Sequence, residues 1–246
     1  MSKARDAAAS PGAQTAAPSG PPTGAQRPIR VLLADDHAVF RQGLRQLLEL
    51  EDDLAVVGEA ATGEEAQALV RELRPDVVLM DINMPDLDGI AATQAIRAAH
   101  PQTQVIMLTM YGEEGSAVAA VRAGAQGYLL KTADIGEVAR AVRVTRQGGT
   151  VVDATLLPKL LRAFQRQESD PGAPSRERLS ERELALVRLL AEGQSNKELA
   201  RELGVAERTI KNQLSPLFRK LGVQDRTQAA VYALAHGLVP EPGERP

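Results

Sequence analysis

The stretch VVLMDINMPDLDG (Val77 to Gly89) decides the fold of the first half of this chain. Its apolar run ends abruptly at the carboxylate of Asp81, which is typical of a buried parallel strand that carries an acidic residue to the C-terminal edge of a sheet. Open α/β sheets bind their ligands at that edge. Asp81 is therefore the first candidate for a functional residue.

Three further apolar stretches end in polar side chains, as parallel strands do when their carboxyl ends meet at one edge. They are IRVLLADDH with Asp35 and Asp36, VIMLTM with Thr109, and GYLLK with Lys131. Three neighbouring carboxylates need a compensating charge, which a hard divalent cation with oxygen ligands supplies. Carboxylates, a cation, a hydroxyl and an ammonium group around one oxygen nucleophile are the groups that phosphoryl transfer requires. A single buried aspartate is more often a helix cap or a member of an ion pair. Polar residues at the ends of four apolar strands are a much stronger indication of a functional site.

Helical segments alternate with these strands throughout residues 29–149. A second strand is expected at Leu54 to Ala60, and helices are expected near residues 38–49, 63–73, 89–99, 113–123 and 134–147. Alternating units of this length predict an α/β domain with a doubly wound, five-stranded parallel sheet covered on both faces.

With these motifs, residues 29–149 resemble the receiver domain of a two-component response regulator, whose fold is flavodoxin-like. The resemblance implies that Asp81 accepts a phosphoryl group from a sensor histidine kinase. It also implies that Mg²⁺ is the cofactor, held by Asp35, Asp36, Asp81 and the backbone carbonyl of Asn83.

The same resemblance gives roles to residues at the ends of the last two strands. It makes Thr109 the switch hydroxyl, Lys131 the lysine that pairs with the phosphate, and Tyr128 the switch aromatic. Thr132 departs from the family pattern, because many receivers carry proline and a cis peptide at that position.

The composition limits the classes of protein to which the chain can belong. With 246 residues it exceeds a typical single domain, and a hydrophobic content of 43% is enough to build real cores. The chain has no cysteine, so disulfides and thiolate metal sites are excluded, which fits a cytoplasmic protein. No apolar run reaches the roughly 18 residues that a membrane crossing needs. Residues 1–28, rich in Ala, Pro, Gly and Ser, are expected to form a disordered tail.

The second half of the chain is expected to be a smaller, all-helical domain. Residues 150–174 are interpreted as a linker with a short helix interrupted by Pro158, and residues 175–246 as four short helices. The net charge of −3 hides an asymmetry, since acidic residues predominate in 29–149 and basic residues slightly predominate in 175–246. This balance favours the second domain as the part that meets a polyanion.

The third of these helices, Ala206 to Leu221, has the pattern of a DNA-reading element. Its apolar residues form one stripe, and the opposite side is polar, with Arg208, Asn212, Ser215 and Arg219, while Lys211 lies on a flank. Together with the short helix Asn196 to Gly204, it matches helix-turn-helix geometry. Some helix-turn-helix domains bind no DNA, so the pattern alone favours DNA binding without establishing it.

The segment LSERELALVRLLAEGQSNKELARELGVAERTIKNQLSPLFRKLGVQDRTQA resembles the LuxR-type DNA-binding domain, and the chain from Ile29 resembles a NarL/FixJ-family response regulator. This resemblance implies contacts with double-stranded DNA. Bases would be contacted by Lys211, Asn212 and Ser215, and phosphates by Arg208, Thr209, Lys220 and Arg226. It also implies a homodimer, in the phosphorylated or the DNA-bound state, on paired half-sites.

Three residues of the third helix depart from that family's pattern. Ala206 stands at the usual serine N-cap, Gln213 replaces a very common histidine, and Pro216 falls inside the helix. Proline removes a backbone donor and crowds the carbonyl four residues before it, so we expect a bend between Asn212 and Pro216.

The sequence therefore predicts a phosphorylation-controlled transcription regulator that is not an enzyme. One alternative is a Mg²⁺-dependent phosphatase with Asp81 as nucleophile. Such phosphatases carry an acid/base aspartate two residues later, where this chain has Asn83, whose amide cannot transfer a proton. The other alternative is a protein-interaction switch whose helix-turn-helix no longer binds DNA, as Gln213 and Pro216 could indicate.

Overall fold

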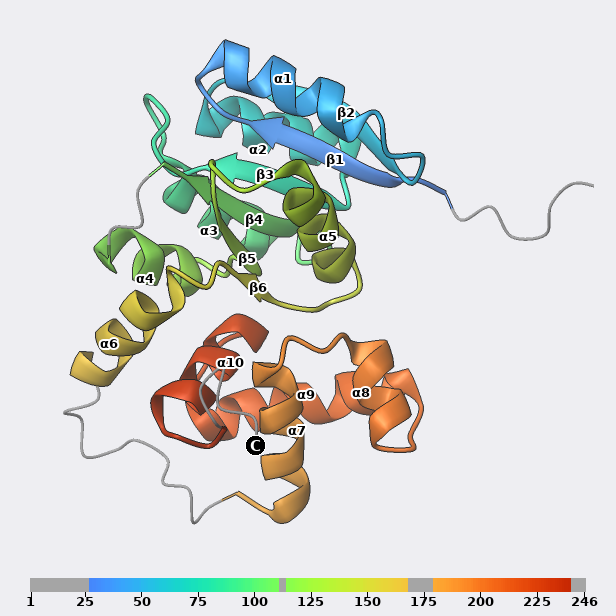
Figure 1. The fold of residues 1–246 in the computed structure, drawn as a ribbon, viewed down its shortest axis with the longest axis vertical. Coiled ribbons are helices and arrows are strands. Elements are labelled where there is room, and N and C mark those ends of the chain that lie inside the picture. Colours follow the sequence, from blue (N-terminus) through green and yellow to red (C-terminus); the bar gives the residue numbers. More distant parts are fainter. Residues whose placement is uncertain (1–26, 111–113, 168–178, 240–246) are drawn as a thin grey trace, which may run out of the picture.

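A computed structural model of the chain describes residues 27–110, 114–167 and 179–239. Residues 1–26 of the predicted disordered tail and residues 168–174 of the predicted linker lie outside the described residues. Those that are described form a parallel sheet with its helices, followed by a helical domain, as Figure 1 shows. No helix among them is both long and apolar enough to cross a membrane.

The sheet has the strand order β2-β1-β3-β4-β5-β6, with every pair parallel. The strands are β1 (Ile29–Ala34), β2 (Leu54–Ala60), β3 (Val77–Asp81), β4 (Gln104–Thr109), β5 (Gly127–Leu130) and β6 (Val151–Val152). The first five follow the flavodoxin-like order, which confirms the predicted fold class. Because the order reverses at β1 and β3, the carboxyl ends of these two strands form the crevice in which such sheets bind ligands.

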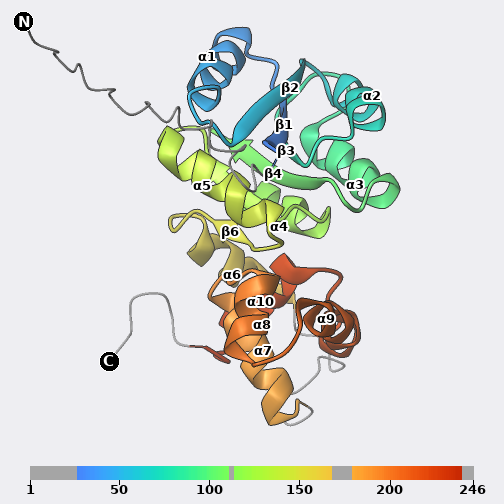
Figure 2. The same cartoon turned by 90° about the vertical axis from the view of Figure 1, so that its right-hand side faces the viewer.

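Five helices cover the two faces of the sheet. They are α1 (Ala38–Leu48), α2 (Gly63–Leu73), α3 (Gly89–Ala99), α4 (Glu114–Arg122) and α5 (Ile135–Arg146). Buried side chains of α1 and α5 belong to one apolar core, and those of α2, α3 and α4 belong to the other. Figure 2 shows the two layers on either side of the sheet.

The sheet has one strand more than predicted. Val151 and Val152 pair with Gly127 and Tyr128, so that β6 extends the sheet beyond β5. A strand of two residues is too short to produce a readable alternation in the sequence. The sequence therefore predicts a linker here, where the structure has a strand.

Helix α6 (Leu157–Gln167) is also part of the packed structure. The prediction that Pro158 interrupts this helix is wrong, because Pro158 is its second residue, where proline is tolerated. Leu156 and Leu160 are fully buried, in the same core as Val231 of the C-terminal domain. The chain from β6 to α6 therefore joins the two domains through shared apolar contacts.

The described part of the C-terminal domain, residues 179–239, contains the four helices that the sequence predicts. They are α7 (Glu181–Ala191), α8 (Asn196–Glu202), α9 (Glu207–Leu221) and α10 (Arg226–Ala235). Ser180 forms the predicted capping box with Glu183, and Ser195 forms a second one with Glu198. Gly204, with a φ of 64°, ends α8 in the left-handed conformation that glycine adopts without strain. The turn at Gly204 leads directly into α9.

Candidate functional site

Two carboxylates and an ammonium group meet at the carboxyl ends of β1, β3 and β5. Asp35 follows β1 and Asp81 ends β3, and each residue is only 2% exposed. The Nζ of Lys131, just after β5, lies 2.7 Å from Asp35 Oδ2 and 2.8 Å from Asp81 Oδ2. The structure thus brings together three of the residues that the sequence predicts at this edge.

The buried position changes the proton affinities of this group. Burial raises the pKa of Asp81, and the nearby charge of Asp35 raises it further, while Lys131 opposes both effects. Burial lowers the pKa of Lys131, but its hydrogen bonds to Asp35 and Asp81 outweigh this and raise it overall. One ammonium group therefore balances two carboxylates, and the site retains an excess of negative charge.

The excess charge extends to the surface, where a cation could enter. Asp35, Asp36, His37 and Asp81 each place a ligand atom within 4.8 Å of the others. The side chain of Asp36 is 35% exposed, and its Oδ1 lies 2.7 Å from Nδ1 of His37. The oxygen atoms of this set suit a hard divalent cation. The sequence does not predict that His37 belongs to this cluster, because a single histidine after two aspartates forms no periodic pattern.

The loop after β3 places Asn83 and Gly89 close to Asp81. The backbone N–H of Asn83 donates a hydrogen bond to the Asp81 carboxylate and helps to lower its pKa. The side chain of Asn83 is exposed. At Gly89, a Cβ atom would collide with the backbone carbonyl of Asp81, so the close return of α3 requires glycine here. Asp88 then caps α3 by accepting from Ala91 N–H.

Thr109 and Tyr128 lie on neighbouring strands beside this edge. Thr109 ends β4 and is 2% exposed, and its carbonyl accepts a hydrogen bond from Lys131 N–H at 2.8 Å. Tyr128 of β5 is fully buried in the core formed with α3 and α4. The peptide bond between Lys131 and Thr132 is trans, since the described residues contain no cis peptide.

Helix α1 supports the site with two residues that the sequence did not reveal. Arg41 donates a hydrogen bond to the backbone carbonyl of Asp35 and a second one to Glu59 Oε2 at 3.0 Å. The Nζ of Lys131 lies 5.0 Å from the ring centre of Phe40, at cation–π distance. Both contacts hold Asp35 and Lys131 in place from the side of the sheet opposite Tyr128.

The second candidate surface is the exposed side of α9. The apolar stripe of this helix, Ile210, Leu214, Leu217 and Leu221, is buried in the core of the C-terminal domain. The opposite side is exposed and carries Arg208, Lys211, Asn212 and Ser215. Thr209 is partly buried, and Lys220 is exposed on a flank, where its Nζ donates to Glu183 Oε2 of α7 at 2.6 Å. The structure thus groups six of the seven predicted DNA contacts on one helix.

Arg226 differs from the other six predicted contacts. It is 7% exposed, and its guanidinium donates to Asn196 Oδ1 at 3.0 Å and to the carbonyl of Gln194. Burial lowers its pKa to about 10. In this arrangement of the domains the guanidinium of Arg226 is bound to the α7–α8 loop and buried, unlike the other predicted contacts, so its contact with a DNA phosphate stays a prediction. The sequence did not show that the first turn of α10 faces that loop.

Two of the departures in the third helix have visible consequences. Ala206 is the N-cap of α9 and makes no side-chain hydrogen bond, unlike Ser180 and Ser195. Pro216 lies inside α9 on the exposed side, and the helix continues past it to Leu221. Water can therefore reach the carbonyl of Asn212 that the proline leaves without its usual donor.

Comparisons with known proteins identify the families of both domains. Residues 31–143 match the family of response regulator receiver domains, and residues 177–233 match the bacterial regulatory proteins of the luxR family. Response regulator protein VraR of Staphylococcus aureus is 40% identical over 211 residues, which cover 86% of this chain and 99% of that protein. The chain belongs to the response regulators with a LuxR-type DNA-binding domain. It is therefore a transcription regulator of the kind that phosphorylation controls.

Solved structures show the same architecture. A two-component response regulator of the LuxR family from Aurantimonas sp. SI85-9A1 is 34% identical, with a TM-score of 0.53, over 56% of this chain and 98% of its own. The RcsB response regulator of Salmonella typhimurium is 26% identical, with a TM-score of 0.52, over 85% of this chain and 99% of its own. A two-component response regulator RcsB–DNA complex is 25% identical, with a TM-score of 0.52, over the same shares.

Proposed function

We propose that this response regulator accepts a phosphoryl group on Asp81 from a sensor histidine kinase, and that this modification controls its binding to double-stranded DNA. The observation that carries the proposal is the contact of Lys131 Nζ with both Asp35 and Asp81 at the edge where β1 and β3 diverge. An ammonium group in this position can move from the free carboxylate to a phosphoryl oxygen without leaving the site.

Mg²⁺ is the cofactor that fits the acidic cluster best. Asp35, Asp36 and Asp81 would hold it together with the backbone carbonyl of Asn83, and it would neutralise the oxygens of the incoming phosphoryl group. Asp36 is the most exposed of the three carboxylates, so it would meet the hydrated cation first.

The residues around Asp81 would divide the remaining work. One Oδ of Asp81 would form the new P–O bond as the bond between phosphorus and the donor nitrogen breaks. The hydroxyl of Thr109 would donate to a phosphoryl oxygen, and the neighbouring Tyr128 would repack against α4 when Thr109 moves. We propose that the site does not act as a phosphatase, because Asn83 provides an amide where such an enzyme would need an acid/base carboxyl group.

DNA binding would use the exposed side of α9. Lys211, Asn212 and Ser215 would reach base edges in the major groove, while Arg208, Thr209 and Lys220 would contact phosphates. Helix-turn-helix proteins bind paired half-sites as dimers, so we propose a homodimer on DNA. The exposed Arg208 and Lys211 on α9 support the contact with DNA.

Phosphate labelling tests the first half of the proposal. With Mg²⁺ and a small phosphodonor, the intact chain should gain one labile acyl phosphate by mass spectrometry, and Asp81→Asn should gain none. Asp86→Asn is the matched control, because Asp86 is exposed in the same loop and asparagine tolerates its positive φ. Labelling of Asp81→Asn at the wild-type level would overturn the assignment. Asp36→Ala should abolish Mg²⁺-dependent labelling, because the cation loses an oxygen ligand.

Quantitative DNA binding tests the second half. Affinity should fall steeply with salt, because phosphate contacts release counterions. Lys211→Ala should weaken binding to the preferred site by about 1–3 kcal/mol if this lysine contacts a base. An equal loss on random DNA would instead make Lys211 a phosphate contact, and failure of the wild type to bind any DNA at low salt would refute the DNA-binding role.

A further inference from the structure

Two arginines of α1 share one carboxylate partner on β2. Nε of Arg41 donates to Oε2 of Glu59 at 3.0 Å, and a guanidinium nitrogen of Arg45 donates to Oε1 of Glu59 at 2.8 Å. The hydrogen bond from Arg45, with a smaller effect from Arg41, holds the pKa of Glu59 below its ordinary value. Glu59 therefore stays ionised and fixes two arginines that lie one helical turn apart.

Arg41 reaches the proposed phosphorylation site, whereas the contacts of Arg45 lie further along α1. A guanidinium nitrogen of Arg41 also donates to the backbone carbonyl of Asp35, and the Arg41 side chain is only 15% exposed. The Arg45 side chain is 41% exposed, and its second partner is Oε1 of Glu49 at the end of α1, at 2.9 Å. The contact with Asp35 is thus what separates two otherwise similar side chains.

The carbonyl that Arg41 binds belongs to the peptide group between Asp35 and Asp36. This peptide group is planar, so a hydrogen bond that fixes its carbonyl also fixes the direction in which the chain enters Asp36. The N–H of Asp35 is held as well, because it donates to the carbonyl of Ala60 at 3.0 Å. The side chain of Asp36 is 35% exposed, so the backbone contributes much to where its carboxylate lies.

A positive charge beside the carboxylates of Asp35 and Asp36 has two opposite effects on a cation. The charge of Arg41 repels it, whereas the hydrogen bond from Arg41 keeps its ligands oriented. Glu59 is ionised and contacts Arg41, so it compensates much of the repulsion. Residues that orient the ligands of a metal typically change its affinity by about 10-fold or more. Orientation should therefore be the larger of the two effects.

We propose that Arg41 is a positioning residue for the cation site. Held by Glu59, it fixes the carbonyl of Asp35 and so orients the carboxylates of Asp35 and Asp36 toward Mg²⁺. In this role Arg41 itself touches neither the cation nor the phosphoryl group. This inference rests on the proposed function, because it takes Asp35 and Asp36 as ligands of the cation.

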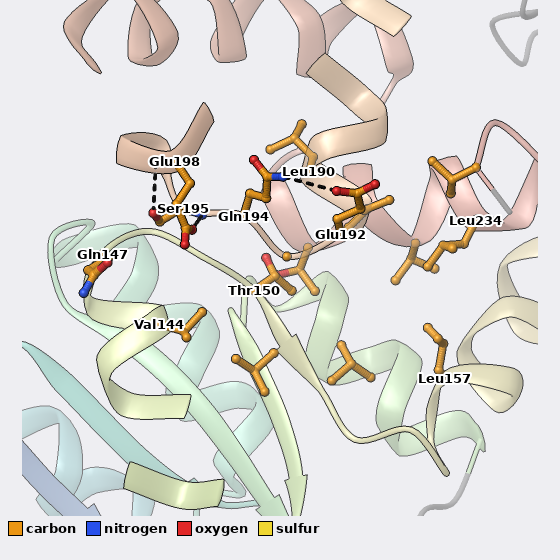
Figure 3. A pocket seen from close by; sticks show the side chains of 18 of the residues that line it. Val144, Gln147, Thr150, Leu157, Leu190, Glu192, Gln194, Ser195, Glu198 and Leu234 are labelled. Carbon is orange, nitrogen blue, oxygen red and sulfur yellow. Dashed lines mark hydrogen bonds between the residues drawn. The ribbon is translucent and has the colours of Figure 1, made fainter. Parts of the chain in front are cut away.

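Both arginines lie away from the cavity between the two domains. This cavity, with a volume of about 760 Å³, is lined by α5, β6 and the start of α6 on one side and by α7, α10 and the α7–α8 loop on the other (Figure 3). None of the residues of α1 and β2, all of which the structure describes, lines it. A change in cation binding in variants of these arginines therefore cannot come from this cavity, so the intact chain can be used.

Binding of Mn²⁺ measures this role without phosphorylation. Mn²⁺ takes the same oxygen ligands as Mg²⁺, and its electron spin resonance signal reports the free ion in the presence of the intact chain. Arg41→Met removes the donor and keeps a long side chain, so it should weaken Mn²⁺ binding by about 10-fold. Repulsion alone predicts the opposite, because the loss of a positive charge would tighten the binding of a cation. The sign of the change thus separates the two effects.

Arg45→Met is the matched control, because it removes the same charge from the same helix and a hydrogen bond to the same Glu59. It leaves the carbonyl of Asp35 bonded to Arg41, so Mn²⁺ affinity should stay within about 2-fold of the wild type. Arg41→Lys should weaken binding by only about 3-fold, since an ammonium group can donate to the Asp35 carbonyl but lacks the fork of arginine. Arg45→Lys is the control for that variant and should bind Mn²⁺ as the wild type does.

The Mg²⁺ dependence of Asp81 labelling gives a second readout. Arg41→Met should need about 10-fold more Mg²⁺ for half-maximal labelling, and it should approach the wild-type rate at saturating Mg²⁺, because excess cation offsets the weaker orientation of the ligands. A lower saturating rate with an unchanged Mg²⁺ requirement would contradict the proposal, since Arg41 would then act on phosphoryl transfer itself.

The outcomes for the positioning role and for the cation site differ. The positioning role is supported if Arg41→Met weakens Mn²⁺ binding and Arg45→Met does not. It is overturned if Arg41→Met binds Mn²⁺ as tightly as the wild type or more tightly, or if both variants weaken binding equally. No binding by the wild type, or binding that Asp36→Ala leaves unchanged, would reject the proposed cation site itself. Circular dichroism establishes that each variant is folded, and if Arg41→Met is not, the two lysine variants decide.

Discussion

The two polar sites of this protein are built in opposite ways. In the receiver, Asp35, Asp81 and Lys131 are almost fully buried, and each charged group has a partner within 3 Å. On α9, Arg208 and Lys211 point into solvent, and the ion pair of Lys211 with Glu207 joins two exposed side chains at 3.3 Å. The receiver site is organised before any ligand arrives, whereas Arg208 and Lys211 on α9 remain in solvent until a ligand binds.

This difference determines what a substitution does at each site. Removing one member of a buried charge cluster leaves the others unpaired in a poorly solvated environment, which costs stability. Removing an exposed charge costs little stability, because water solvates what remains. Changes in the receiver site should therefore alter folding and function together, while substitutions of exposed charged side chains on α9 should alter DNA binding alone.

The largest expected effect is that of Lys131→Met. Without the ammonium group, the carboxylates of Asp35 and Asp81 would face each other at low exposure, and the receiver should lose about 3 kcal/mol of stability at neutral pH. The pKa of Asp81 is already raised by burial and would rise further, so the loss should shrink as the pH falls through that pKa. Native-state hydrogen exchange of β1 and β3 amides measures this for the receiver separately.

Lys211→Met provides the matched comparison for that experiment. The same change on the exposed face of α9 should leave hydrogen exchange within about 0.5 kcal/mol of the wild type in both domains. Equal losses from the two substitutions would show that the contrast between a buried and an exposed site is wrong. A stable Lys131→Met receiver would show that the carboxylates are solvated well enough to stand alone.

The same contrast explains what could be predicted from the sequence. The strands that lead to Asp35, Asp81 and Lys131 can be predicted from the sequence, because burial requires an apolar run before each polar residue. The apolar stripe of α9 can also be predicted, because one side of this helix is buried in the core. The capping box of Ser180 and Glu183 and the turn at Gly204 follow local rules that need no tertiary information.

What could not be predicted depends on contacts between distant segments. Strand β6 is only two residues long, and its pairing with β5 follows from where the turn at Gly148 directs the chain. The burial of Arg226 depends on how α10 meets the α7–α8 loop. His37 joins the acidic cluster through the local path of the chain after β1. None of these leaves a periodic pattern, so the sequence could not show them.

Pro216 should have the next largest effect, and it concerns α9 alone. The proline lies within the helix and removes the hydrogen bond to the Asn212 carbonyl, so Pro216→Asn should raise the stability of the C-terminal domain by about 2 kcal/mol. Pro158→Asn in α6 is the control, because a first-turn residue has no helical acceptor and should gain nothing. Calorimetric melting of the full chain measures both variants. An unchanged melting temperature for Pro216→Asn would mean that α9 has adapted to the proline.

The smallest effect should come from the N-cap of α9. Ala206→Ser would place a hydroxyl where it can accept a hydrogen bond from Thr209 N–H, as Ser180 and Ser195 do for their own helices. We expect a gain of about 1 kcal/mol. No full capping box would form, because the third helical residue is threonine, which cannot reach back as Glu183 and Glu198 do.

Ser180→Ala provides the reciprocal change on α7, and it should lose about as much stability as Ala206→Ser gains. DNA affinity should stay at the wild-type level in Ala206→Ser, because the exposed side chains of α9 keep their positions. A gain in DNA affinity without a gain in melting temperature would mean that the cap orders α9 only on DNA. In that case DNA would order not only the exposed side chains of α9 but also the first turn of the helix itself.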